Sequence, residues 1–367
     1  MQKHGGTVML DRSVVTIPEK FMDHPLFTAP VCGMNVGFMA RRGYYETEEM
    51  QKQPELMKKA GVNWVTLNMN CCQKAYYSRD IFLDFEFSTG EIELMRYVEL
   101  LHKNDIHVLF KPCLTPLDGM WMGSINFPTG QQIQGVNTDY WTEWFNSFKR
   151  AMKYFSHIAE VIGMDAMLIG AEYRGTESKA KEWNEVIEIV RENFSGPISY
   201  EFTPASCKVP PEWFKNLDFL SYSYYPPAAP RTGLAKDSPD YTREQMEEYL
   251  KSRQETVKWL SETFGNKPVV FSEYGVRSAH GLIMQPENFT STSHYDGQQQ
   301  ADYMEASFNT FYQLPQWMGL FWWKWDETQD RPHYKDDPNG DKGFTIQGKP
   351  AEKVLVRWFK ENFTDKK

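Results

Sequence analysis

Two glutamates are candidates for acid and base chemistry, because each ends an apolar run typical of a buried β-strand. Glu273 follows Val269-Val-Phe-Ser, and Glu172 follows Met167-Leu-Ile-Gly-Ala. A carboxylate buried without a partner is costly, so a chain that places one there usually has a use for it. Two carboxylates in one pocket can cleave a glycosidic bond. One protonates the leaving oxygen, and the other attacks the anomeric carbon or activates water.

The acid of such a pair must keep its proton near neutral pH, so burial or the charge of its partner has to raise its pKa. The separation of the two carboxyl groups decides between retention and inversion of the anomeric configuration, and sequence spacing does not give it. The alternative is that Glu172 and Glu273 are unrelated surface residues, with Glu273 pointing into water or pairing with Arg277.

The elements that would position these glutamates alternate regularly along the chain. We predict strands over 31–38, 62–69, 107–113, 166–170, 198–202, 218–224, 269–273 and 319–325. We predict helices over 47–60, 89–103, 139–161, 178–193, 242–264, 297–312 and 351–363, and a short helical turn near 211–216. Eight strands alternating with helices predict a (β/α)8 TIM barrel. The competing doubly wound sheet should show a GxGxxG turn, and none is present.

Loop lengths indicate which end of the barrel carries the chemistry. Long segments follow four of the strands, at 114–138, 225–241, 276–296 and 326–350, whereas the connections into strands are mostly a few residues long. Barrel active sites are built from the loops that follow the strands, so the glutamates that end the fourth and seventh strands should face each other there. Without an internal repeat or a low-complexity linker, we expect one catalytic domain over 31–363 after a lead-in over 1–30.

Composition indicates a neutral substrate. The chain has 367 residues, with 40 Lys plus Arg, 49 Asp plus Glu, a net charge of −9 and no basic run of five. We therefore expect neither a nucleic acid nor a membrane surface as a partner. Aromatic residues make up 15% of the chain, including 12 Trp. Most should fill the core, but Trp and Tyr near loops also suit the flat apolar faces of sugars.

The cysteines indicate a reducing compartment. Cys32, Cys71, Cys72, Cys113 and Cys207 are odd in number and form no CxxC motif, so we expect reduced, partly buried thiols. The first residues contain no apolar stretch of a signal peptide, and no later run reaches 18 apolar residues. We expect a cytoplasmic protein, unless a signal peptide has been trimmed from this sequence.

Other chemistries lack their motifs. There is no GxSxG, no HExxH and no GxxxxGK[ST]. Asp337, Asn339 and Asp341 alternate in a Gly-containing loop, which loosely resembles a site for a hard cation such as Ca²⁺. The closing Glu of such a site is missing, so we favour a solvated turn and predict neither a metal nor another cofactor.

Residues around both glutamates resemble glycoside hydrolase family 113. The resemblance lies in Leu168-Ile-Gly-Ala-Glu-Tyr-Arg-Gly-Thr176, Leu217-Asp-Phe-Leu-Ser-Tyr-Ser-Tyr-Tyr-Pro226, Val270-Phe-Ser-Glu-Tyr-Gly275, Phe110-Lys-Pro-Cys113 with Asp118-Gly-Met-Trp-Met-Gly123, Gly61-Val-Asn-Trp-Val-Thr-Leu67 with Gln73, and Gly319-Leu-Phe-Trp-Trp-Lys-Trp-Asp326. It runs from about Gly33 to Phe359 in strand order. It implies a retaining (β/α)8 hydrolase of the two-glutamate clan acting on β-1,4-mannan, with Glu172 as acid/base and Glu273 as nucleophile.

One position departs from the wider clan, which usually has Asn immediately before the acid/base. Here that residue is Ala171, so the clan's usual contact from the Asn amide to the sugar 2-hydroxyl is in doubt. Mannose differs from glucose at that carbon, and a preference for an axial hydroxyl is our hypothesis.

Three aromatic residues near the strand ends have two interpretations each. Tyr224, at the end of the sixth strand, either donates a hydrogen bond to Glu273 or packs in the core. Trp323 and Trp325 alternate on the eighth strand and so should share a face. If that face points inward, one of them can form the floor of a sugar subsite, as in clan members; otherwise both belong to the core.

Three more residues are substrate-binding candidates. Lys111 lies within an apolar strand and is not expected to be buried unpaired, so it should reach the cleft and donate to a sugar hydroxyl. Trp121 and Gln73 fall on predicted loops of the active face. For Trp121, packing against the surface is the alternative.

Two functions from different classes follow. The first is a hydrolase of β-mannan or manno-oligosaccharides, or of another β-linked glycan, which needs no cofactor. The second is a barrel that binds glycans without turnover, of which Ala171 would be a symptom. The missing signal peptide favours short, imported oligosaccharides, because polymeric mannan does not enter a cell.

Overall fold

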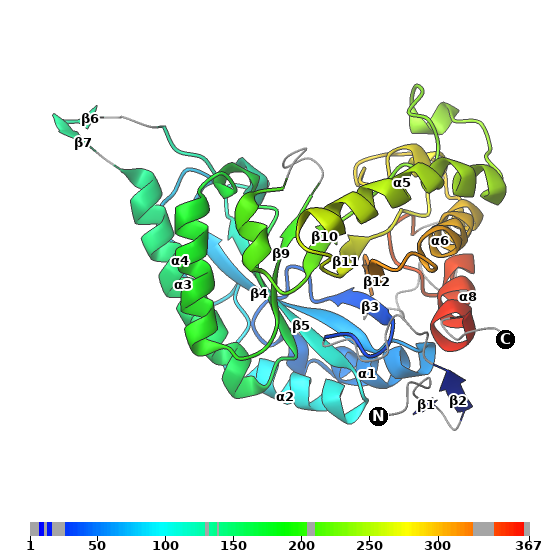
Figure 1. The fold of residues 1–367 in the computed structure, drawn as a ribbon, viewed down its shortest axis with the longest axis horizontal. Helices are drawn as coiled ribbons and strands as arrows, with labels where there is room; N and C mark the ends of the chain where they lie inside the picture. The colour runs from blue at the N-terminus through cyan, green and yellow to red at the C-terminus, as the bar shows by residue number, and fades with distance from the viewer. Residues whose placement is uncertain are drawn as a thin grey trace. The chain divides into compact units, whose positions relative to one another are not determined.

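The structure is a computed structural model that describes residues 7–10, 13–16, 26–128, 132–137, 139–203, 210–325 and 341–362. Eight strands form a closed barrel in the order β10-β11-β12-β3-β4-β5-β8-β9. Their bounds are β3 Val31–Val36, β4 Trp64–Gln73, β5 His107–Pro116, β8 Ala166–Ala171, β9 Ile198–Phe202, β10 Leu220–Ser223, β11 Val269–Tyr274 and β12 Trp317–Trp322. Paired strands such as β5 with β8 and β12 with β3 run parallel. The predicted (β/α)8 barrel is confirmed. Figure 1 labels these strands along the chain.

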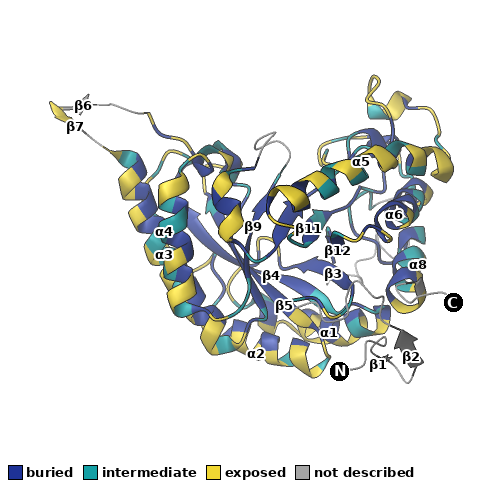
Figure 2. Ribbon diagram, viewed as in Figure 1, coloured by how far each residue is buried: buried dark blue, intermediate teal, exposed yellow. Residues whose placement is uncertain are grey.

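Helices follow the strands as predicted, to within a few residues. They are α1 Glu48–Ala60, α2 Glu91–Lys103, α3 Tyr140–Ile162, α4 Ala180–Asn193, α5 Arg243–Thr263, α6 Gly297–Phe311 and α8 Pro350–Arg357. Side chains of Asp139, Thr242 and Asp296 accept hydrogen bonds from the first turns of α3, α5 and α6. Gly163, in the left-handed conformation at φ 81°, ends α3. Figure 2 shows the buried faces of α3 and α4 beside their exposed faces, as expected for amphipathic helices.

The chain divides into two compact units that are each interrupted in sequence. One unit comprises Val36–Pro54 and Val65–Ser223, and the other Met1–Asn35, Glu55–Trp64 and Tyr224–Lys367. The first contains β5, β8, β9, β10 and all of β4 except Trp64, and the second contains β11, β12 and all of β3 except Val36. Within the lead-in, β1 (Thr7–Leu10) and β2 (Ser13–Thr16) pair antiparallel. The division into a lead-in over 1–30 and one catalytic domain over 31–363 stays a prediction.

An aromatic cluster forms the core behind β8 and β9. Trp183 on α4 stacks on Trp213, with ring centroids 4.8 Å apart, and both rings contact Tyr200 of β9. Trp144 on α3 stacks on Phe148 at 5.0 Å. Large rings packed in this way bury much apolar surface and leave little freedom to the strands beneath them. Most of the tryptophans here fill the core, as predicted.

A second aromatic cluster fixes β11. Tyr274 lies between Phe271 and Tyr303, with centroids 5.3 Å and 5.7 Å away, and its hydroxyl donates to Ser307 Oγ at 2.7 Å. The pairing of β11 with β12 is irregular between Phe271 and Tyr274, which is the stretch that contains Glu273.

Membrane-spanning helices and clusters of metal ligands are both missing from the described residues. No helix there is long and apolar enough to cross a membrane. In the same parts of the chain, no group of three or more His, Cys, Asp or Glu side chains is placed to hold a metal ion.

Candidate active site

Glu172 lies at a sharp turn immediately after β8. Its φ is 58°, in the left-handed region that costs a residue with a side chain about 1–2 kcal/mol. Two main-chain hydrogen bonds hold the turn: Glu172 N–H donates to the Glu201 carbonyl at 2.7 Å, and Arg174 N–H donates to the Glu172 carbonyl at 2.8 Å. A residue kept in such a conformation is typical of a functional site.

Trp121 contacts the carboxylate of Glu172. Its indole Nε1 donates to Glu172 Oε2 at 3.0 Å, and its side chain is 39% exposed. The segment after Trp121 and the segment after Glu172 are packed closely, because a Cβ at Gly175 would lie 1.8 Å from the Ile125 carbonyl oxygen. A donor of this kind stabilises the ionised form of a carboxylate. Trp121 was predicted to bind substrate, and the structure places it on the candidate acid/base itself, so any sugar contact of its ring stays a prediction.

Glu273 lies within β11 and is half-buried. The hydroxyl of Tyr225 donates to Glu273 Oε2 at 3.0 Å. The backbone N–H of Tyr224 donates to the Glu273 carbonyl at 2.8 Å. The Tyr225 ring packs edge-on against Phe344 at 6.1 Å. Glu273 is therefore tied to the segment after β10 by one side-chain bond and one main-chain bond.

The predicted contact from Tyr224 to the carboxylate is wrong. The Tyr224 ring is 5% exposed and packs against Phe271 and Tyr274, at 5.1 Å and 6.5 Å. Burial raises the pKa of its hydroxyl well above the usual value. The strand β10 ends at Ser223, one residue before the predicted end, so Tyr224 lies outside the strand. The hydroxyl that reaches Glu273 belongs to the next residue, Tyr225.

Lys111 does not reach a cleft. Its side chain is 3% exposed, and its ammonium lies 2.6 Å from Oε1 of Glu201, which is 1% exposed. This buried ion pair joins β5 to β9 inside one unit. Lys111 was expected to need a partner, but that partner is a protein carboxylate and not a sugar hydroxyl.

Gln73 is the last residue of β4 and is fully buried, so its predicted place on a loop is wrong. Its Nε2 donates to the Ala75 carbonyl at 2.8 Å, and its Oε1 accepts from Trp144 Nε1 at 3.0 Å. Because both ends of the amide are engaged within the protein, Gln73 positions the strand end and does not bind substrate.

The two tryptophans after β12 do not share a strand face. The strand ends at Trp322, before Trp323, so the alternation predicted over 319–325 does not hold. Trp325 is 4% exposed, and its N–H donates to the Asn35 carbonyl at 3.0 Å, which makes it a core residue. Trp323 is half-buried, its peptide bond to Lys324 is cis, and it stays a candidate for a sugar subsite.

Asp341 is paired with a lysine. Its Oδ2 lies 2.8 Å from the ammonium of Lys349, which also donates to the Thr345 carbonyl at 2.7 Å. Burial alone would raise the pKa of Asp341, but the Lys349 ammonium holds that pKa below its usual value. The other two residues of the considered cation motif, Asp337 and Asn339, lie outside the described residues.

Four cysteines are buried free thiols: Cys32, Cys71, Cys72 and Cys113; Cys207 lies outside the described residues. Burial raises the pKa of the Cys72 thiol to about 11.

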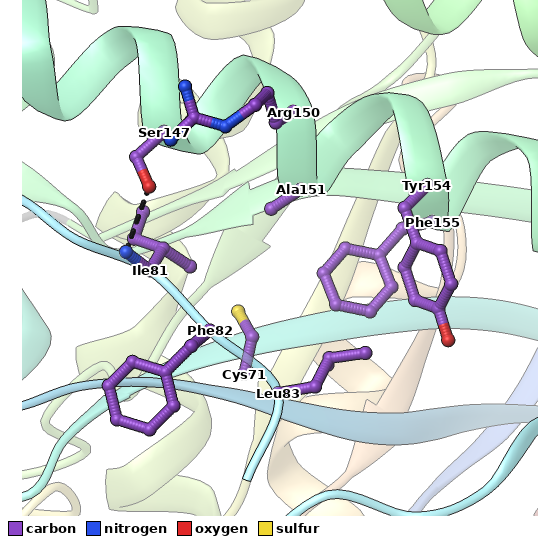
Figure 3. Close-up of a pocket in the computed structure, with 9 residues that line it drawn as sticks. All are labelled: Cys71, Ile81, Phe82, Leu83, Ser147, Arg150, Ala151, Tyr154 and Phe155. Carbon is purple, nitrogen blue, oxygen red and sulfur yellow. Dashed lines mark hydrogen bonds between the residues drawn. The ribbon is translucent and has the colours of Figure 1, made fainter.

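A cavity of about 170 Å³ lies beside Cys71, against Ser147 and Phe155 of α3 (Figure 3). It is lined by no candidate catalytic residue, and the Ser147 hydroxyl beside it already accepts a hydrogen bond from Ile81 N–H at 2.9 Å.

Sequence reasoning missed Tyr225 and Glu201. Tyr225 was passed over because Tyr224 was placed at the strand end, although both tyrosines precede Pro226. Glu201 showed the signal used for the other two glutamates, a carboxylate in an apolar strand. Looking for a partner to Lys111 among strand carboxylates would have found it.

Comparison with known proteins places the chain in a family. The sequence model of Glycoside Hydrolase Family 113 matches residues 34–349. No curated protein sequence matches the chain. A solved structure of a family 113 β-1,4-mannanase is 23% identical, with 90% of this chain and 99% of that chain covered and a TM-score of 0.76.

Two further structures are similar in fold. A family 113 β-mannanase from Alicyclobacillus acidocaldarius, in complex with ManMIm, is 24% identical over 90% of this chain and 97% of that one, with a TM-score of 0.76. A family 5 mannosidase from Rhizomucor miehei is 14% identical over 92% and 95%, with a TM-score of 0.62. At these identities the structures show a shared fold. The family match, which spans most of the sequence, shows more: the chain belongs to glycoside hydrolase family 113 and is a glycoside hydrolase.

Proposed function

We propose that this enzyme cleaves β-1,4-mannosidic linkages in mannan or manno-oligosaccharides, with retention of the anomeric configuration. Family membership supports the reaction class, and the similar family 113 structures are described as β-1,4-mannanase and β-mannanase. The observation that carries the proposal is that Glu172 and Glu273 each end or follow a barrel strand and each accept a hydrogen bond from an aromatic side chain.

Barrel topology supports placing both glutamates in one active site. The strands of a closed parallel barrel all end at the same rim, where the following loops build the site. Glu172 comes directly after the last residue of β8, and Glu273 is the second-to-last residue of β11. On this basis we propose that the two carboxylates act on the same sugar linkage.

The proposed roles follow the family resemblance. In the first step Glu172 gives its proton to the glycosidic oxygen while Glu273 attacks the anomeric carbon. The bond from that carbon to the leaving oxygen breaks, and a covalent glycosyl-enzyme forms. In the second step Glu172 takes a proton from water, the water oxygen bonds to the anomeric carbon, and Glu273 leaves as a carboxylate.

Tyr225 suits the role of Glu273 as a nucleophile. A tyrosine hydroxyl that donates to a carboxylate fixes the orientation of that carboxylate, and an attacking carboxylate needs a fixed orientation. Ala171 is 2% exposed and has no side-chain amide, so it does not supply the contact to the sugar 2-hydroxyl that Asn supplies in the wider clan. We keep the preference for an axial 2-hydroxyl as part of the proposal.

Digestion of mannohexaose tests the activity. We expect reducing sugar to be released by the intact protein and not by Glu273→Ala, and the products over time distinguish internal cleavage from trimming at one end. Proton NMR of the first products tests the stereochemistry, because retention gives the β-anomer before mutarotation. An α-anomer formed first would contradict the double displacement. No release from mannan or any other β-linked glycan would favour a barrel that only binds glycans.

A further inference from the structure

A buried tyrosine holds the segment that carries Glu172. The hydroxyl of Tyr200, in β9, accepts a hydrogen bond from Tyr173 N–H at 2.8 Å. The same hydroxyl lies 2.9 Å from Glu177 Oε1. Tyr200 is fully buried and Glu177 is 3% exposed. One side chain therefore links the residue after Glu172 to a buried carboxyl four residues further along.

The direction of these bonds is fixed by chemistry. A backbone amide only donates, so the Tyr200 hydroxyl has to accept from Tyr173. The hydroxyl proton therefore points to Glu177, whose carboxyl oxygen accepts the hydrogen bond. Glu177 thus orients the hydroxyl, and the hydroxyl orients the backbone at Tyr173.

Two consecutive residues of β9 accept hydrogen bonds from two consecutive residues of the turn. Glu201 accepts from the backbone of Glu172 through its carbonyl at 2.7 Å, while Tyr200 accepts from the backbone of Tyr173 through its hydroxyl. The turn needs such bonds, because Glu172 is held at φ 58°, where a residue with a side chain is strained. Without them the backbone would relax and move the carboxylate.

Close packing fixes the Tyr200 ring in place. A Cβ at Gly170 would come within 2.9 Å of both the Tyr200 ring and the Trp183 ring, so the ring fills space that only a glycine leaves open. Trp213 also contacts the ring, at 5.2 Å, and its Nε1 donates to the Glu177 carbonyl at 3.0 Å. This packing holds the Tyr200 hydroxyl in one position, within hydrogen-bonding distance of Tyr173 N–H.

We propose that Tyr200 and Glu177 are a positioning pair for the acid/base Glu172. This inference rests on the proposed function, in which Glu172 protonates the leaving oxygen. Neither residue is expected to touch the sugar, since both are buried. Their effect on the rate comes through the backbone of Tyr173, and small misplacements of a reacting group can lower rates by up to about a hundredfold.

Substrates with different leaving groups test the proposal. A mannosyl leaving group needs a proton, whereas a dinitrophenolate leaves without one, and kcat/KM reports the step in which that group departs. For Tyr200→Phe we expect kcat/KM on mannohexaose to fall by about tenfold or more. On a dinitrophenyl β-mannoside we expect a fall of less than about threefold. An equal fall on both substrates, or no fall on either, would overturn the inference.

Two variants distinguish a failure of the positioning inference from a failure of the proposed function. Glu172→Ala should show the same dependence on leaving group, only larger. If Glu172→Ala loses kcat/KM equally on both substrates, the assigned role of Glu172 is wrong. If Glu172→Ala shows the dependence on leaving group and Tyr200→Phe does not, only the positioning role of Tyr200 is wrong. Tyr45→Phe is the matched control, since Tyr45 is also fully buried and donates to a carbonyl, that of Asn68 at 2.7 Å.

A second pair of variants tests the same link if Tyr200→Phe does not fold. Glu177→Gln keeps an acceptor oxygen for the Tyr200 hydroxyl and should retain kcat/KM on both substrates to within about threefold. Glu177→Leu removes the acceptor and should reproduce the loss on mannohexaose alone. If Glu177→Leu behaves like Glu177→Gln, the proposed positioning role is wrong.

Discussion

The hydrogen bond from Trp121 to Glu172 leads to a prediction about the pH dependence of the reaction. Trp121→Phe removes the indole N–H and leaves an aromatic ring in its place. A hydrogen bond to an ionised group contributes about 1.5–3 kcal/mol when it is shielded from water. The Trp121 side chain is 39% exposed, so water competes and we take about 1 kcal/mol.

The sign follows from which form of the carboxyl the donor stabilises. The indole favours the ionised form, so its loss lets Glu172 keep its proton to higher pH. An acid catalyst has to be protonated, so the basic limb of the kcat/KM profile should move to higher pH. About 1 kcal/mol corresponds to a shift of somewhat less than one pH unit.

The assay is kcat/KM on mannohexaose, measured from acidic to alkaline pH for wild type and Trp121→Phe. Trp259→Phe is the matched control, because Trp259 lies on α5 and is 41% exposed. Its profile should coincide with that of the wild type. A basic limb that stays in place in Trp121→Phe, or moves to lower pH, would refute the reasoning.

Three further predictions concern buried charges and thiols. Lys111→Met or Glu201→Leu alone should lower the free energy of unfolding by about 3–5 kcal/mol in urea titrations, and the double variant should recover most of it; equal losses in all three would contradict a coupled pair. Burial alone lowers the pKa of His280, but a main-chain carbonyl and the Asp296 carboxylate raise it above its usual value. The stability it adds is complete below the unfolded pKa, about 6.5, and is lost as pH rises through the folded pKa. His280→Ala should therefore lower Tm more at about pH 6 than at about pH 8, and the reverse order would show that the sign is wrong. With a pKa of about 11, Cys72 should react with iodoacetamide only slowly in the native protein and quickly in urea, as peptide mapping would show.

The order of elements could be predicted because each barrel strand is an apolar run and each helix has an apolar face. The ends of strands could not. β10 ends at Ser223 and β12 at Trp322, both before the ends predicted from the apolar runs. Tyr224 therefore lies beyond β10 and not at its end, and Trp323 and Trp325 lie beyond β12, where the alternation that gave them a shared face no longer applies.

Partners that lie far apart in sequence account for the other errors. Lys111 and Glu201 are 90 residues apart, and Gln73 and Trp144 are 71 apart. A sequence shows that a buried lysine needs a partner, but only the folded chain shows whether the partner is protein or substrate. The same ambiguity applies to the glutamates, because Glu201 shares their strand setting and forms an internal ion pair. The assignment of Glu172 and Glu273 as the catalytic residues stays a prediction for the kinetic experiments.

The interrupted course of the two units sets the order in which the chain can fold during its synthesis. β3 pairs with β12, with Val31 opposite Gly319 and Cys32 opposite Leu320. The first barrel strand to be synthesised can therefore form this pairing only after the last one. The unit that ends at Ser223 is complete long before that. A nascent chain therefore leaves the backbone groups on one edge of β3 without their partner strand until β12 has been synthesised.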